Sequence, residues 1–264
     1  MDLKKPLLSL GLLALSANAL AATVPSAPAP APVSMGLEAG STVFFVRGSE
    51  DMANGTMSNK GVFCGMRAEM EFVLPKAYHV SVLGVYAPGS QTSSQSVSND
   101  LSSAVYQQSY QSYLWQVEAK AGKMLEVNSF SLLPHLVGGW YHTTSSVGFA
   151  FPEATSEMVS ETKMDWKYAG VGMMASYSFS PNFSVALGGK VMKHIIAEAS
   201  ITNNDFSQAV DLGSDYGYEV YMPVKVWLGP QSSWYVHAEP FMLKVDLEKD
   251  VTIYGGRFSL QKAF

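Results

Sequence analysis

A histidine and a serine two residues apart are the first residues of this sequence with the types and spacing of a base and a nucleophile. His79 and Ser81 flank Val80, and residues i and i+2 lie on the same face of a β-strand. A histidine beside a serine hydroxyl can accept its proton and activate the oxygen for attack on an ester or amide. No carboxylate is evident that would orient the ring, and His-x-Ser often occurs by chance. We therefore expect ordinary strand residues here.

Histidines and aspartates near the ends of four predicted strands form a second group. Its members are His142, Asp165, His194 and Asp215. Imidazole and carboxylate groups that converge at one rim can activate water. The sequence contains no Asp-x-Asp, however, and neither histidine lies beside an aspartate. We expect a solvated rim with no catalytic residue.

Each group resembles the site of an outer-membrane enzyme family in part. His79 and Ser81 are similar to the His-x-Ser pair of the outer-membrane lipid A deacylases, in which the histidine acts as base for the serine. That site faces outer-leaflet lipid, whereas here the pair is predicted to point inward near the periplasmic end. The omptin proteases, which are ten-stranded barrels, carry Asp/Asp and Asp/His pairs at the external rim, and the missing Asp-x-Asp departs from their pattern. These departures lead us to expect no enzymatic activity.

The sequence carries no motif for a metal, nucleotide or redox cofactor. It has no His-Glu-x-x-His, no Cys-x-x-Cys and no glycine-rich phosphate loop, so we expect no cofactor. Cys64 is the single cysteine, which excludes an intramolecular disulfide. The formal net charge is −5 and the basic residues are scattered, which argues against a nucleic-acid partner.

The first 35 residues indicate export. Lys4 and Lys5, the apolar run 7–15 and the small residues Ala19 and Ala21 have the order of a secretory signal peptide, so we expect cleavage after Ala21 and removal of residues 1–21. Residues 22–35 are rich in proline and alanine, a composition that favours an extended periplasmic linker. Residues 36–264 are predicted to form one domain.

The elements that must position all these side chains are strands of alternating polarity. From Val62 to Leu74 every second residue is apolar, which is the period of a strand with one face in an apolar environment. No run of 18 apolar residues follows residue 36, so a transmembrane helix is not expected. Comparable patterns predict ten strands, at about 36–47, 62–74, 77–87, 105–121, 129–143, 164–179, 183–196, 216–228, 234–246 and 251–264.

The connections between these strands alternate in length. Those at 75–76, 122–128, 180–182 and 229–233 are short, and those at 48–60, 88–104, 144–163 and 197–215 are long and polar. Outer-membrane barrels have short periplasmic turns, long external loops and an even strand number. We predict an all-β fold, a closed antiparallel up-and-down transmembrane β-barrel of ten strands. The short last connection, 248–250, leaves eight strands as an alternative, and a soluble lipocalin-like barrel would also show alternating strands.

The composition fits an apolar outer surface. Only 15% of the residues are charged and 47% are hydrophobic, whereas soluble domains are about 25% charged. A band that faces lipid needs few charges, and aromatic residues gather at its two borders. The aromatic residues near predicted strand ends are Tyr78, Tyr86, Tyr113, Trp115, Trp140, Trp166, Tyr177, Trp234 and Tyr235.

The last strand resembles the carboxy-terminal assembly signal of Gram-negative outer-membrane β-barrels. Phe264, Leu260 and Phe258 lie on one face of this strand, and Lys262 departs from the pattern because the family usually has an apolar residue there. The resemblance implies insertion by the outer-membrane assembly machinery, with Phe264 and Leu260 in contact with it.

Charged residues that alternate with the apolar positions of the strands are predicted to point inward and fill the lumen. They are five basic and five acidic residues: Arg67, Lys120, Lys190, Lys225, Arg257, Glu69, Glu71, Glu118, Glu219 and Glu239. Matched charges favour a salt-bridge network, since an unpaired buried charge costs several kcal/mol. A selective pore would instead carry a ring of one sign. Asp165 and Lys167 share a face with Val171, and a bulge in that strand would resolve the ambiguity.

These observations favour a bacterial outer-membrane barrel with a structural or surface-interaction role, similar to that of an adhesin. Its expected partners are outer-membrane lipid, the assembly machinery and an external ligand bound through 88–104 and 144–163, which are rich in polar residues. A small porin or hydrophobic-compound channel is the first alternative. A lipid-modifying or omptin-like barrel enzyme is the second.

Overall fold

The computed structural model describes residues 34–52, 55–99, 102–149, 158–203, 206–211, 215–229, 233–246 and 250–263. The predicted signal peptide, the linker up to residue 33 and Phe264 lie outside this range. Among the described residues no helix is long and apolar enough to cross a membrane. One 3-10 turn, η1 (Pro75–Ala77), accompanies the strands.

The described residues form one antiparallel sheet of thirteen strands. Two of these, β10 and β11, both pair with β8 and β12 and so make up one barrel strand, while β5 pairs with β6 and β9 with β8. Ten barrel strands result within the described range. The strands are β1 (Ser34–Met52), β2 (Gly55–Leu74), β3 (Tyr78–Asn99), β4 (Ser102–Lys123), β5 (Leu125–Val127), β6 (Phe130–Phe149), β7 (Met158–Ser180), β8 (Phe183–Asn203), β9 (Phe206–Asp211), β10 (Tyr216–Tyr221), β11 (Val224–Trp227), β12 (Trp234–Asp246) and β13 (Asp250–Ala263).

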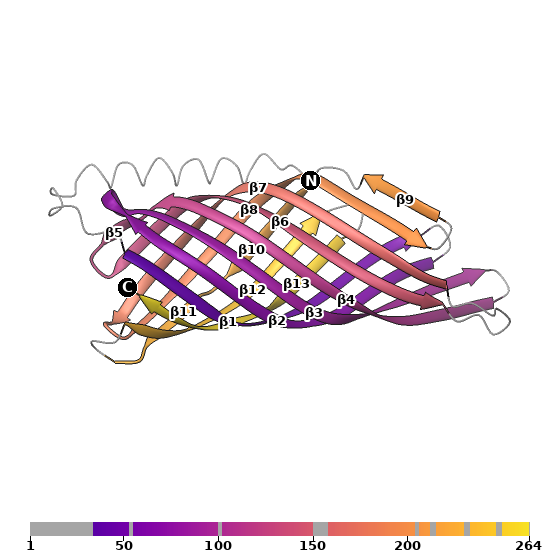
Figure 1. Ribbon diagram of the computed structural model, residues 1–264, viewed down its shortest axis with the longest axis horizontal. Coiled ribbons are helices and arrows are strands. Elements are labelled where there is room, and N and C mark those ends of the chain that lie inside the picture. Colours follow the sequence, from indigo (N-terminus) through magenta and orange to yellow (C-terminus); the bar gives the residue numbers. More distant parts are fainter. Residues whose placement is uncertain are drawn as a thin grey trace.

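Pairing of the first strand with the last closes the sheet. β1 and β13 run antiparallel in register from Gly36 opposite Ala263 to Ser49 opposite Asp250. The strands slant across the long axis of the closed barrel (Figure 1), as closure requires. The prediction of a closed all-β barrel with ten strands is confirmed, and the eight-strand alternative is wrong.

Side-chain exposure alternates along the strands. In β10 exposed and buried residues follow one another from Tyr216 to Tyr221, and in β2 Met66 is 70% exposed whereas its neighbour Arg67 is buried. The exposed set is apolar over most of the barrel height, with Leu136 and Leu187 among its members. An apolar outer surface is what a lipid environment requires.

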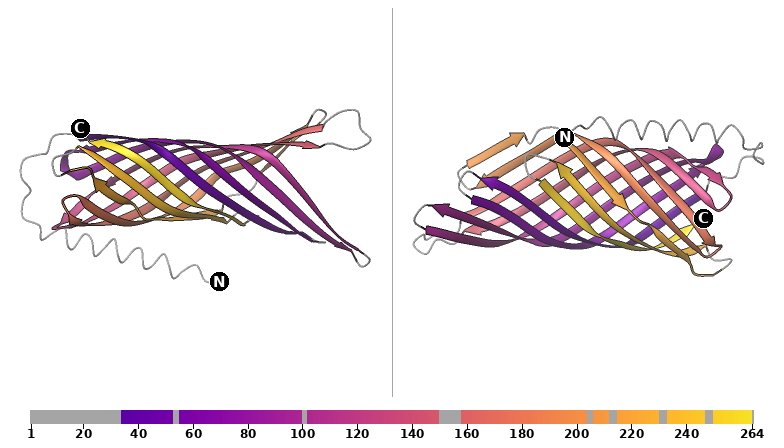
Figure 2. Two further views of the ribbon diagram at one scale, coloured as in Figure 1. Left: turned by 90° about the horizontal axis from the view of Figure 1, so that it is seen from below. Right: turned by 180° about the vertical axis from the view of Figure 1, so that it is seen from behind.

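The predicted long external loops are mostly strand. The region 88–104 continues β3 to Asn99 and starts β4 at Ser102, and these two strands project beyond the others as a ribbon (Figures 1 and 2). Likewise β6 extends to Phe149 and β7 starts at Met158, inside the predicted loop 144–163. Apolar alternation stops where the lipid stops, but backbone pairing continues into water, so a pattern of polarity underestimates strand length.

Two of the predicted girdle aromatics point into the barrel. Trp166 and Tyr235 are buried, whereas Trp115, Trp140 and Trp234 are exposed on the outer surface. The error has a simple cause. An aromatic residue near a strand end can lie at a lipid border or in an inner apolar layer. Which of the two it occupies depends on the face of the strand from which its side chain projects.

The β-bulge expected in the strand of Asp165 lies instead in the neighbouring strand, β8. Lys167 pairs with Ile196 and Tyr168 with His194, so Ile195 of β8 is the extra residue. β7 itself keeps its parity, with Trp166 and Tyr168 buried and Lys167 exposed. Asp165 and Lys167 therefore belong to the outer surface.

Candidate functional site

A chain of ion pairs crosses the lumen. Lys190 of β8 pairs with Glu118 of β4 and, at 2.8 Å, with Glu219 of β10. Arg257 of β13 lies 3.0 Å from Glu219 and pairs also with Glu239 of β12. The side chains of Lys190, Glu118 and Glu219 are each only 1% exposed. Each charge thus has an opposite neighbour, which is the condition for burying ions at tolerable cost.

Glu38 extends this network to the first two strands. Its carboxylate accepts a hydrogen bond from Ser259 at 2.5 Å and lies 2.9 Å from the Arg67 guanidinium and 3.0 Å from His237 Nδ1. Arg67 also donates to Glu69 at 2.6 Å. Strands β1, β2, β12 and β13 are therefore tied together by one buried carboxylate.

The remaining predicted lumen charges occupy the edges of this network. Lys120 lies 3.3 Å from Glu118. Nearer the chain ends, Glu71 accepts a hydrogen bond from Gln261 at 2.8 Å and interacts with His79 Nε2 at 2.9 Å. Lys225 donates to the Tyr235 hydroxyl at 3.3 Å. All the predicted lumen residues thus lie on inward positions of their strands, and Glu71 and Lys225 form contacts of their own beside the central network.

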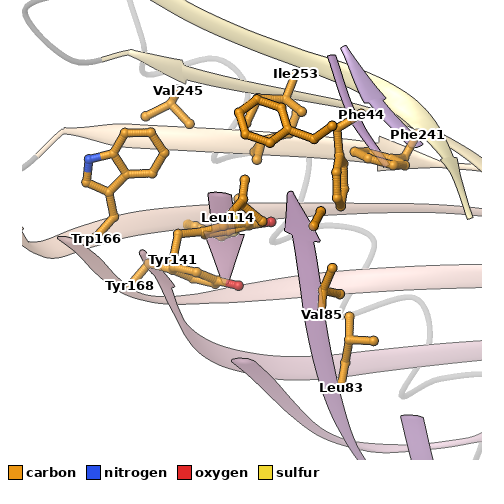
Figure 3. Close-up of a cluster of buried hydrophobic side chains, with 14 of the residues drawn as sticks. Phe44, Leu83, Val85, Leu114, Tyr141, Trp166, Tyr168, Phe241, Val245 and Ile253 are labelled. Atoms are coloured by element: carbon orange, nitrogen blue, oxygen red, sulfur yellow. The ribbon is translucent and has the colours of Figure 1, made fainter. Parts of the chain in front are cut away.

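An apolar layer fills the lumen beyond the ion pairs. Figure 3 shows Phe44, Leu114, Tyr141, Trp166 and Phe241 converging from different strands. The Phe44 and Phe241 rings meet edge to face at 5.6 Å, and the Tyr141 and Tyr168 rings stack at 5.6 Å. The alternation pattern suggests apolar residues for the lipid side only, so this inner layer is a departure from our expectation.

Glu38 and His237 are both central to the network, although neither is among the predicted lumen charges. Glu38 shares its strand face with Phe44, and His237 lies two residues from Glu239 on the inward face of β12. The inward positions of β1 include few charged residues, so the sequence pattern alone does not show which face of this strand points into the lumen. In the structure Glu38 is the register partner of Glu69 on β2, and this pairing places the Glu38 side chain inside the barrel.

His79 and Ser81 both point inward and are buried, as the alternation predicts. His79 bonds to Glu71 of the adjacent strand. A carboxylate is therefore present, although the sequence around the pair does not reveal it. The pair lies near the barrel end at which β1 begins, away from the outer surface.

The four rim residues do not form a single group. His142 and Asp165 meet on the outer surface, with His142 Nδ1 3.0 Å from Asp165 Oδ1. His194 is buried inside, where its ring and backbone N–H contact the backbone carbonyl of Asp215 at 3.0 and 2.9 Å. Among the described residues no three His, Cys, Asp or Glu side chains are arranged to hold a metal ion.

The described part of the predicted assembly signal lies on the outer surface. Phe258 and Leu260 are exposed there, and Phe264 is outside the described residues. Lys262 reaches back over the Trp234 ring, with its Nζ 5.4 Å from the ring centre. This contact accounts for a lysine on an otherwise apolar face, since the ring stabilises the cation.

Comparison with known proteins yields structural matches alone. Neither a protein-family model nor a curated protein sequence matches the chain. The outer membrane protease OmpT from Escherichia coli superposes with a TM-score of 0.63 at 12% identity, covering 90% of this chain and 99% of OmpT. The β domain of the Bordetella autotransporter BrkA has a TM-score of 0.40 at 10% identity, covering 90% and 100%. Ail of Yersinia pestis reaches 0.39 at 10% identity, covering 89% and 100%.

Identities this low compare folds and leave activities open. The OmpT match spans nearly the whole of both chains, and the apolar outer surface and closed sheet suit a bilayer. The described part of the chain therefore has the fold of an outer-membrane β-barrel protein, with ten barrel strands.

Proposed function

We propose that this barrel is sealed and acts through its exterior as a surface-interaction protein. The filled lumen is the observation that carries the proposal. Buried ion pairs link β4, β8, β10, β12 and β13, and an apolar layer lies beside them. Water and solutes would have to displace both layers, and a path through paired buried charges is costly.

The ribbon of β3 and β4 is the proposed interaction surface. It projects beyond the other strands (Figure 2), and its segment 88–113 is rich in serine, glutamine and tyrosine. Described side chains bridge the two strands: Tyr110 donates to Gln91 at 3.0 Å, and Thr92 and Ser109 lie 3.1 Å apart. Such bonds order the ribbon in advance, which lowers the entropic cost of binding. Tyrosine and serine are also common in adaptable protein-binding surfaces.

A channel function is the weaker alternative, because the lumen charges are paired and balanced in sign. Planar-bilayer recordings test it. The refolded barrel is expected to add no stepwise conductance under conditions in which a general porin, reconstituted in parallel, does. Regular conductance steps from the folded protein would contradict the sealed barrel.

Adherence tests the interaction surface. Ser93 pairs with Gln108, so replacing 94–107 with Asn-Gly shortens the ribbon and retains its register. Cells that display this variant are expected to bind an epithelial monolayer less than cells with the unchanged protein. The matched control replaces 50–57 with Asn-Gly between the paired Ser49 and Ser58. Equal adherence of the ribbon-shortened and unchanged barrels would rule out the ribbon as the binding surface.

A further inference from the structure

Three polar side chains at outward-facing positions of β6 and β7 form a hydrogen-bonded series. His142 Nδ1 lies 3.0 Å from Asp165 Oδ1, and His142 Nε2 lies 2.9 Å from Thr144 Oγ1. Trp140 Nε1 donates to the same Asp165 oxygen at 2.8 Å. The series joins β6 to β7, where His142 and Asp165 are direct register partners.

The hydrogen-bond chemistry assigns a role to each group. An ionised carboxylate only accepts, so Asp165 requires a proton on His142 Nδ1. In the neutral ring Nε2 then carries a lone pair and accepts the Thr144 hydroxyl proton. A hydroxyl, a base and a carboxylate that fixes the tautomer of that base are the three parts of an activated nucleophile.

The series lies where the apolar outer band ends. Along the outward face of β6, Leu136 is 66% exposed, Trp140 follows, and His142 and Thr144 come next, away from the barrel end at which β1 begins. A tryptophan at this level marks the border between acyl chains and headgroups. Lys163 and Lys167 of β7 are the register partners of Thr144 and Trp140 and are exposed on the same surface. Lys163 pairs with Glu161 at 3.0 Å, whereas the charge of Lys167 favours anionic headgroups.

A groove on the outer surface lies near the hydrogen-bonded series. The pairing of β2 with β3 stops at Phe63 opposite Gly89 and resumes at Met66 opposite Tyr86, because Pro88 has no N–H to donate. A groove of about 650 Å³ lies over this break, and its lining includes Val62, Cys64, Tyr86, Pro88, Gly89 and Tyr113. Tyr113 is the register partner of both Pro88 and Thr144. The groove and the hydroxyl are therefore two strand spacings apart, or about 10 Å.

We propose that Thr144, His142 and Asp165 form a site that cleaves acyl esters of an outer-leaflet lipid, with one acyl chain in the groove beside Pro88. This activity goes beyond the proposed surface interaction. The substrate class follows from the position of the site. A nucleophile on the lipid-facing side of a barrel, at the headgroup border, meets the ester bonds of membrane lipids.

The reaction needs no partner other than water. Thr144 Oγ1 attacks the ester carbonyl carbon while its proton passes to His142 Nε2. The bond from the carbonyl carbon to the alcohol oxygen breaks, and the leaving oxygen takes the proton from His142. Water then attacks the acyl-threonine through the same base, which releases a fatty acid and restores the hydroxyl. Thr144 is only 1% exposed, so neighbouring side chains must move when lipid binds, and its register partners Tyr113 and Lys163 are the candidates.

Fatty-acid release from the full-length refolded barrel tests the proposal. Vesicles of phosphatidylethanolamine form one arm and vesicles with added lipopolysaccharide the other, so mass spectrometry of the released acids identifies the ester source. Thr144→Val keeps the side-chain shape and is expected to abolish release, whereas Thr144→Ser retains it. Asp165→Asn is expected to lower the rate at least about a hundredfold, because it disturbs the histidine tautomer. Ser131→Ala removes a hydroxyl bonded to Ser176 elsewhere on the barrel and serves as the control with unchanged release.

A covalent probe provides a second readout that is independent of the lipid. A fluorophosphonate is expected to label position 144 in both the unchanged barrel and the Thr144→Ser variant, as mapped by peptide mass, and to leave Thr144→Val unlabelled. Heat-dependent gel migration shows that each variant is folded. If the folded barrel neither releases fatty acid in either arm nor reacts with the probe, the proposal is wrong. Release that persists in folded Thr144→Val would equally overturn it.

Discussion

The Arg257 guanidinium lies over the Phe241 ring, with Cζ 4.0 Å from the ring centre. The same guanidinium pairs with Glu219 and Glu239. Arg257 therefore joins the ion-pair network to the apolar layer, because its planar guanidinium can stack on an aromatic ring while its N–H groups bind carboxylates. The lumen is consequently one continuous packed interior whose polarity changes along the barrel axis.

Removal of one central cation should destabilise the barrel strongly. Lys190→Met leaves Glu118 and Glu219 buried beside each other without their shared cation. We expect a loss of about 3–5 kcal/mol in the free energy of unfolding, measured by denaturant titration in lipid vesicles. Lys123→Met is the control, because Lys123 is exposed and contacts Tyr78 on the outer surface. A change at Lys190 no larger than the control would show that the buried network contributes little.

The close approach of an aromatic ring to a glycine makes a sharper packing test. A Cβ on Gly188 would lie 2.3 Å from the Tyr221 ring, whereas one on Gly84 would meet nothing within 4 Å. Gly188→Ala must displace a buried ring, so we expect about 1–3 kcal/mol of destabilisation, measured by the same titration. Gly84→Ala should leave the unfolding midpoint nearly unchanged. Equal midpoints for the two variants would contradict the close packing of Tyr221 against Gly188.

The single cysteine reports the orientation of β2. Cys64 is exposed on the outer surface, so a bimane attached to it should lie in lipid and be quenched by brominated acyl chains. In a background of Cys64→Ser, a bimane at Ser112→Cys should be protected, because Ser112 is buried on the inward face. Quenching of both labels, or of the Ser112 label alone, would mean that the inside and outside are wrongly assigned.

The resemblance of the last strand to an assembly signal predicts a defect in insertion. Phe264→Ser should lower the amount of heat-modifiable barrel in the outer membrane several-fold. Phe258→Tyr, which keeps an aromatic ring on the outward face, should leave that amount unchanged. Undiminished insertion of the Phe264 variant would show that this barrel does not depend on the terminal aromatic residue.

The sequence predicts the architecture well because strand alternation is a local property. The run from Val62 to Leu74 shows which side chains share a face, and the lengths of the turns indicate the order of the strands. Charged residues such as Glu118 and Lys190 can be assigned to the lumen from parity alone. The pairing of these two residues cannot be predicted from the sequence pattern, because they are 72 residues apart in the chain.

The candidate site shows where local pattern fails. The sequence groups His142 and Asp165 with His194, which the fold turns inward, and a threonine at a polar strand end is too common for Thr144 to carry a signal. Sequence alone determined the alternation, the closed barrel class and ten of the inward charged residues, since these depend on the two-residue period of a strand. Only the tertiary structure decided the register between strands, which places Asp165 beside His142 and Tyr113 beside Thr144. The tertiary structure also shows that an apolar layer fills part of the lumen.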